Sequence, residues 1–145
     1  MKIPKKTTYG MCFMLRLAVS YGDKYIKLNE IAKSENIPEK YLENIVSVFK
    51  PANLILVKRG AKGGYKLSMP PGQIKLKEVY EILNGGILQE TLVERSLNET
   101  LNKKVVIDLW QELRLKLSEF FESITLQDMV NDYKKKHEDQ LFYVL

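Results

Sequence analysis

The chain has few of the residues from which metal centres, disulfide frameworks and hydrolytic sites are built. Its 145 residues include one cysteine, Cys12, and one histidine, His137. A lone cysteine excludes an intrachain disulfide and fits a reducing cytoplasm; a small, half-buried hydrophobe is its favoured role over a redox thiol. No metal-ligand spacing, paired carboxylates or Ser/His/Asp set is present. We therefore expect no metal, no cofactor and no enzymatic activity.

Long apolar runs are also missing. No stretch approaches the roughly 20 residues needed to span a bilayer, so we expect no membrane association. Lysines precede an apolar stretch near the N-terminus, but Arg16 interrupts it and no small-residue cleavage site follows, which argues against a signal peptide. The 45% apolar and 28% charged composition is typical of a globular cytoplasmic protein.

Charge is unevenly distributed along the chain. Residues 1–66 contain 13 Lys and Arg against 5 Asp and Glu, a balance of +8, while residues 67–145 carry −3, giving the net +5. A basic N-terminal half indicates a surface that meets a polyanion, although lysine-rich faces also serve solubility alone. Charge by itself leaves both interpretations open.

The stretch 28–67 predicts the arrangement around which the chain is organised. Helical patterns over 28–35 and 38–50 are separated by a break at Asn36, Ile37 and Pro38. A β-type run over 54–59 and a second short strand at 65–68 flank a glycine-bearing basic tip. Helix, turn, helix and hairpin predict a mainly α fold with a small β-hairpin wing, the winged helix-turn-helix.

The second helix of such a module enters the DNA major groove, and its first turn meets base edges. Leu42, Ile45, Val46 and Phe49 form its apolar face, which leaves Lys40, Tyr41 and Glu43 outward; each of these, taken singly, also fits a solvated helix face. The tip holds Arg59, Gly60, Lys62 and Gly63, which suit a minor groove or phosphates, or form a plain hairpin turn. A P-loop is rejected, since no Gly-Lys-Ser/Thr follows.

Flanking segments complete the expected DNA-binding region, residues 1–85. A basic arm precedes a helix over about 9–21, with Thr7 or Thr8 as its N-cap, and a further helix covers about 76–83. Gly85 and Gly86 mark the boundary we expect. Residues 86–145 form the second region, which begins with a weakly patterned and partly mobile segment at 87–100.

The second region contains the longest predicted helix, 101–123. Its apolar stripe either packs on its own domain or pairs with the same helix of a second chain, and we expect both. The expected dimer-interface residues are Leu101, Val105, Leu109, Trp110, Leu113, Leu117 and Phe120. A short helix, capped by Thr125 and ending near 135, and an apolar tail at 141–145 follow. The tail is a candidate docking segment.

Several segments together resemble the Rrf2 family of bacterial winged-helix regulators. They are Leu28-Asn29-Glu30-Ile31-Ala32, Ile37 with Lys40-Tyr41-Leu42-Glu43, Arg59-Gly60 with Gly63-Gly64-Tyr65, the helix near 74–83, and Thr125-Leu126. The resemblance implies a homodimer with crossed long helices that binds a palindromic operator of double-stranded DNA. It also implies DNA contacts near Thr7, Thr8 and Tyr9, at Lys40, Tyr41 and Glu43, and at Arg59, Lys62 and Gly63.

One departure from the family bears on its cofactor. Members that bind an iron–sulfur cluster carry three cysteines ahead of the long helix, and this chain has none between Gly85 and Leu101. Thiolates are the ligands of such clusters, so we predict a cluster-free regulator, most simply a repressor, with an unidentified effector. The alternative is a winged-helix module that docks on a metabolic enzyme or another protein in place of DNA.

Overall fold

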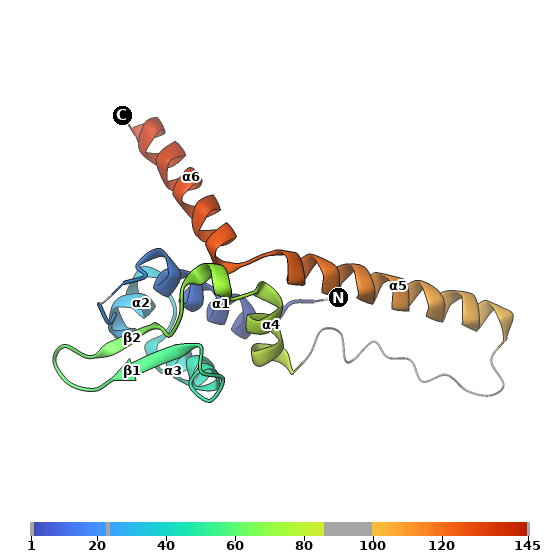
Figure 1. Cartoon of the computed structure of the whole chain (residues 1–145), viewed down its shortest axis with the longest axis horizontal. Coiled ribbons are helices and arrows are strands. Elements are labelled where there is room, and N and C mark those ends of the chain that lie inside the picture. The colour runs from blue at the N-terminus through green and yellow to red at the C-terminus, as the bar shows by residue number, and fades with distance from the viewer. Residues whose placement is uncertain (1, 23, 86–99, 145) are drawn as a thin grey trace.

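The computed structural model describes residues 2–22, 24–85 and 100–144. They form a small head from which the two C-terminal helices project in different directions (Figure 1). Within these ranges no helix is both long enough and apolar enough to cross a bilayer. The expected mobile segment at 87–100 lies almost wholly outside the described residues.

The head is mainly helical and carries one antiparallel hairpin, as predicted. Its elements are α1 (Lys5–Val19), α2 (Leu28–Ser34), α3 (Glu39–Val46), the 3-10 turn η1 (Ser47–Phe49), β1 (Ile55–Lys58), β2 (Gly64–Leu67), the 3-10 turn η2 (Pro71–Gln73) and α4 (Leu76–Asn84). Gly85 ends α4 in the left-handed conformation, with φ of 75°. The predicted winged helix-turn-helix fold is therefore confirmed.

The core of the head lies where the helices meet the hairpin. Phe13 of α1 stacks on Phe49, with ring centroids 6.1 Å apart, and Tyr65 of β2 meets Phe13 edge-on at 5.5 Å. The helix predicted over 38–50 is shorter, because α3 ends at Val46 and the 3-10 turn η1 continues to Phe49. The predicted apolar residues Leu42, Ile45, Val46 and Phe49 are all buried. Aromatic contacts of this kind tie α1, η1 and the wing into one unit.

Helix α1 begins earlier than predicted. It starts at Lys5, after Pro4 at the N-cap position, and no side chain caps it. The predicted N-cap at Thr7 or Thr8 is wrong, since both lie inside the helix. Proline sets an extended entry into a helix without needing a hydroxyl cap. Thr7 instead is fully buried and donates its hydroxyl hydrogen to Asn84 Oδ1 at 2.8 Å, linking α1 to α4.

The hairpin is extended by a third segment that sequence patterns did not predict. Within the hairpin Ile55 pairs with Leu67 and Lys58 with Gly64. Ile26 then pairs with Tyr65 through two N–H···O bonds of 2.8 Å. Gly64 makes this possible: its φ is +137°, and a Cβ there would lie 2.4 Å from the Ile26 carbonyl oxygen.

The C-terminal region consists of α5 (Leu101–Ser123) and α6 (Leu126–Val144). The predicted bounds of the long helix are confirmed, and Thr100 caps it by accepting from the Lys103 N–H at 3.2 Å. The predicted cap of the last helix is also confirmed, as Thr125 and Asp128 bond reciprocally. The predicted end near 135 is wrong, because α6 continues through the expected tail.

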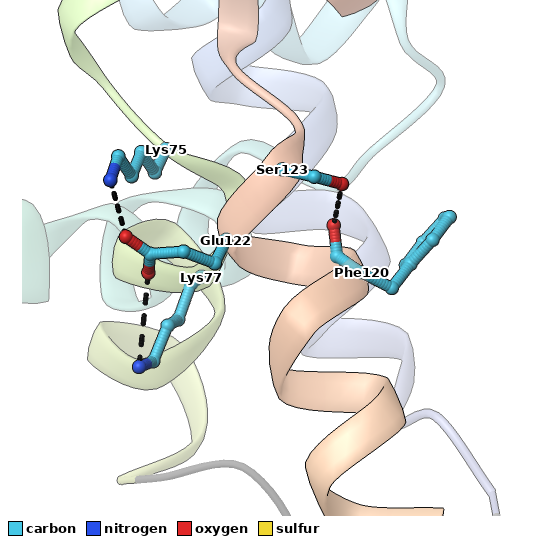
Figure 2. Close-up of polar contacts among 5 residues, drawn as sticks. All are labelled: Lys75, Lys77, Phe120, Glu122 and Ser123. Atoms are coloured by element: carbon cyan, nitrogen blue, oxygen red, sulfur yellow. Dashed lines mark hydrogen bonds and ion pairs between the residues drawn. The ribbon is translucent and has the colours of Figure 1, made fainter.

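The join between α5 and α6 is fastened to the head. The Leu76 N–H donates to Ile124 at 2.8 Å, the Leu126 N–H donates to Ile74 at 2.9 Å, and Tyr80 stacks on Phe121. Figure 2 shows Glu122 between Lys75 and Lys77, which both pair with its carboxylate. Leu126 and Val130 of α6 are buried in the core of the head. The expected division at residue 85 stays a prediction, although the core draws on residues beyond it.

Candidate nucleic-acid interface

The turn between α2 and α3 determines how α3 is presented. Asn36 adopts a left-handed conformation, with φ of 54°, and the Ile37 N–H donates to the Ala32 carbonyl at 2.9 Å. Ile37 is buried, so it anchors the turn from below. Pro38 occupies the N-cap position of α3 and gives the chain an extended entry into that helix. The first turn of α3 therefore begins at a rigid point on the surface.

The outward face of α3 carries the side chains predicted to meet base edges. Lys40, Tyr41 and Glu43 are all exposed, while Leu42 between them is fully buried. Tyr41 is steadied by Tyr9 of α1, whose ring meets it edge-on with centroids 5.8 Å apart. The structure thus brings Tyr9 and Tyr41 together, and an ammonium, a phenol and a carboxylate share one short helical surface.

The start of α1 contributes unequally to this surface. Thr8 is exposed and Tyr9 is half-buried, so both can reach a ligand. Thr7 is buried, with its hydroxyl committed to Asn84, and it does not reach the surface. Lys5 and Lys6 in the first turn are exposed as well. The predicted arm therefore presents Thr8, Tyr9 and two lysines, and Thr7 holds the arm to α4.

At the tip of the wing the cationic side chains are exposed, and a buried glycine shapes the turn. Arg59 and Lys62 are exposed, and Gly60 has φ of +105° with open space around it. Gly63 is buried, its N–H donates to the Gly60 carbonyl at 3.0 Å, and a Cβ there would lie 2.2 Å from the Lys58 carbonyl oxygen. Gly63 therefore shapes the turn from within, while Arg59 and Lys62 supply the charge.

A cationic group on the wing was missed by sequence reasoning. The Tyr25 ring has Lys66 Nζ at 4.7 Å and Lys58 Nζ at 5.7 Å from its centroid. Both distances are within the range of a cation–π interaction. The only sequence signal was the pair Tyr25 and Ile26, a two-residue β-type pattern too short to predict a strand.

Two groups near the interface have raised pKa values. Burial raises the pKa of the Tyr65 phenol, and the Glu43 carboxylate raises it further, so α3 and the wing are electrostatically connected. Burial also raises the pKa of the half-buried Cys12 thiol, with a smaller contribution from Glu35. Cys12 is therefore a protonated, weakly nucleophilic thiol at neutral pH.

The predicted dimer-interface residues lie on a helix face that the protomer leaves largely uncovered. In α5 only Ile107 is buried, and Leu117 is partly covered. The others are exposed: Leu101, Val105, Leu109, Trp110, Leu113 and Phe120. An apolar stripe of this length is unusual on the surface of a monomer.

These features define a class of protein. An exposed first turn of α3, a cationic hairpin tip and a head built on a helix-turn-helix characterise a winged-helix DNA-binding protein. Comparison with known proteins places the chain within that class. The profile of the Rrf2 family, described as an iron-dependent transcriptional regulator, matches residues 3–132. The chain belongs to the Rrf2 family and is a DNA-binding transcriptional regulator, not an enzyme.

The chain matches known transcriptional regulators over most of their length. The chain is 33% identical to the HTH-type transcriptional regulator CymR of Bacillus subtilis, over 99% of this chain and all of that protein. The solved structure of CymR, described as the global cysteine regulator of B. subtilis, superposes with a TM-score of 0.78 at 34% identity, covering 90% of this chain and 97% of that one. The structure of T. potens IscR gives a TM-score of 0.77 at 31% identity, covering 94% and 90%.

Proposed function

We propose that this regulator is a cluster-free repressor that binds a palindromic operator as a homodimer. The observation that carries the proposal is the pairing of two surfaces on one chain: an exposed polar first turn of α3 and an exposed apolar face of α5. The first can meet a half-site, and the second can join two copies. A two-fold dimer presents its α3 helices to two half-sites related by the same symmetry.

Each part of the head has a role at a half-site. Tyr41 and Glu43 meet base edges, where a carboxylate can accept from cytosine N4, and Lys40 meets a base or a phosphate. Arg59 and Lys62 enter the minor groove, with Gly60 and Gly63 keeping the tip narrow. Thr8 and Tyr9 approach the backbone at the start of α1, while Thr7 acts indirectly through Asn84. A dimer seated over a promoter represses by excluding polymerase.

The residues present do not fit an iron–sulfur cluster. Clusters need several thiolates, and the chain has one cysteine, which lies half-buried in α1 with a raised pKa. Among the described residues no group of three His, Cys, Asp or Glu side chains is placed to hold a metal ion. The family is described as iron-dependent, so this chain departs from that description in its ligands. Iron analysis of protein purified without oxygen should find no cluster iron.

Binding to DNA upstream of the gene tests the proposal. With about six to ten phosphate contacts per dimer, affinity should fall roughly 10³- to 10⁵-fold between 50 and 200 mM salt. Arg59→Ala with Lys62→Ala should weaken binding to all sequences, whereas Tyr41→Ala should change which sequences are preferred. Affinity that ignores salt, or a protomer that stays monomeric at every concentration, contradicts the proposal. If deletion of the gene lowers expression of a reporter placed behind the operator, the repressor role is contradicted, but DNA binding is not.

A protein-docking role is the second candidate, and one observation favours it. The last turns of α6 expose Leu141, Phe142 and Tyr143. An exposed aromatic cluster at a helix end is a common protein contact. If this role replaces DNA binding, the protein should fail to bind operator DNA even at low salt. If it accompanies DNA binding, truncation of the cluster should leave operator affinity unchanged.

A further inference from the structure

The outer face of the wing carries a pair of cations that the proposed DNA contacts do not use. Lys58 closes β1 and Lys66 lies in β2, and both direct their ammonium groups over the ring of Tyr25. Side chains alternate along a strand. The pairs Ile55–Leu67 and Val57–Tyr65 therefore share the face toward the core, and Lys58 and Lys66 lie on the outer face. Tyr25 reaches this face because its neighbour Ile26 pairs with Tyr65 in an isolated β-bridge.

The two ammonium groups lack a neutralising partner in the described part of the chain. No ion pair there involves Lys58 or Lys66; the pairs found lie on α4, α5 and α6. Both cations share one ring, so their mutual repulsion is relieved only partly by the negative face of the phenol. Each ammonium has three N–H donors. Such a pair favours an anion that can accept from both groups.

The position of this pair points to the identity of the anion. Lys58 immediately precedes Arg59, so the pair continues the positive charge of the tip up one side of the hairpin. The opposite side of the sheet is covered by α1 through the contact of Tyr65 with Phe13. With the tip in a minor groove, the open side of the hairpin faces the sugar-phosphate backbone that borders the groove.

We propose that Tyr25, Lys58 and Lys66 form a phosphate-binding site for the DNA backbone just outside each half-site. This proposal rests on the proposed function. Lys58 and Lys66 contact the phosphates, and Tyr25 is a positioning residue that holds both ammonium groups on the outer face. The site reads no bases, because phosphates carry no sequence information directly. It lengthens the stretch of duplex that the protein needs for full affinity.

Duplex length provides the experiment. Affinity is measured by fluorescence anisotropy on two duplexes, one ending at the half-site edges and one with flanks of about one helical turn, roughly 10 base pairs. Lys58→Ala with Lys66→Ala should weaken binding about 10-fold or more on the long duplex and lower its salt slope by about 2 per protomer. On the short duplex the variant should match the wild type.

Tyr25 is tested by two substitutions of different chemistry. Tyr25→Phe keeps an aromatic face for both cations and should retain the long-duplex affinity. Tyr25→Leu keeps apolar bulk without that face and should lose part of the affinity and of the salt slope. Thermal unfolding of both variants shows whether the head remains folded. A loss in both variants alike overturns the positioning role.

A matched control and the opposite outcomes complete the design. Lys134→Ala with Lys135→Ala removes the same charge from exposed positions on α6 and should leave both duplexes unaffected. An equal loss on both duplexes, or no loss on the long one, for the Lys58/Lys66 variant overturns the phosphate site. Absence of binding by the wild type to either duplex overturns the proposed function itself, so the two failures are distinguishable.

Discussion

Phe13, Leu42 and Phe49 are fully buried in the head, whereas α5 leaves Leu109, Trp110 and Leu113 exposed. Both regions have helical apolar stripes in sequence. In the head each stripe meets another element of the same chain. In α5 the exposed stripe meets solvent, apart from the contacts that its C-terminal turns make with α4. Periodicity identifies a helix face that must be covered, and only the fold shows whether the chain itself covers it.

The largest expected effect tests the head. Phe49→Ala removes a fully buried ring that stacks on Phe13, and the cavity left behind should lower the free energy of unfolding by about 3–5 kcal/mol. Urea denaturation followed by circular dichroism measures this loss. Val48→Ala, at the exposed neighbouring position, is the matched control and should change stability little. Equal losses would contradict the placement of the core.

The next effect tests α5. Leu113→Glu places a carboxylate on the exposed stripe and should weaken dimerisation by about 2–4 kcal/mol, roughly 30- to 1,000-fold in dissociation constant. Sedimentation equilibrium measures the dimer. Leu115→Glu makes the same change about 200° further around the helix axis. Leu113 is 43% exposed and Leu115 58%, so equal dissociation by both variants would contradict an interface confined to the stripe.

The next effect is a loss of stability caused by backbone strain, and it should differ between two glycines of the wing. Gly64→Ala forces a Cβ to within 2.4 Å of the Ile26 carbonyl at a φ of +137°, and should destabilise the head by about 2–4 kcal/mol. Gly60→Ala also has a positive φ but meets open space, so about 1 kcal/mol is expected. Thermal unfolding ranks the two. The reverse order would contradict the pairing of Ile26 with Tyr65.

A smaller effect concerns the link from α1 to α4. Thr7→Val removes the hydroxyl that Asn84 Oδ1 accepts from and leaves that oxygen unsatisfied, which should cost about 1–2 kcal/mol of stability. Thr8→Val changes an exposed neighbour in the same way and should stay within about 0.5 kcal/mol of the wild type. Denaturant midpoints for the two variants decide whether the hydroxyl of Thr7 acts in the interior.

The smallest effect depends on pH at the join between head and α5. The hydrogen bond from Lys75 lowers the pKa of Glu122, and the charges of Lys75 and Lys77 add to it. A lowered folded-state pKa stabilises the fold above the ordinary pKa, near 4.5, and this contribution is lost as pH falls through the folded value. Glu122→Gln should lower the melting temperature slightly at about pH 7, and this difference should shrink as the pH falls below about 4.5. Glu119→Gln, an exposed control on α5, should show no such dependence.

Much of the head could be predicted because its signals are local. The buried face of α3 and the left-handed Gly85 that ends α4 follow from short-range spacing and turn chemistry. The bounds of α5 follow from its uninterrupted stripe. The exposed positions of Lys40, Tyr41 and Glu43 follow from the same spacing, since Leu42 must point inward.

The remaining features depend on contacts between distant residues. The pairing of Ile26 with Tyr65, and the cations that it brings to Tyr25, join segments some 40 residues apart, and no local pattern shows that they pair. The predicted end of α6 near 135 falls at three consecutive lysines, which interrupt the apolar pattern. In the helix, Lys136 pairs with Asp132 one turn earlier at 2.7 Å, which supports continuation.

The burial of Leu126 and Val130 within the head has a consequence for synthesis. The chain emerges from the ribosome N-terminus first, so the DNA-binding part lacks two of its core residues until most of the polypeptide has been made. A premature stop codon before residue 126 would leave an incomplete interior. Such truncated products are expected to be degraded, and a half-length fragment that occupies operators without pairing would not accumulate in the cell.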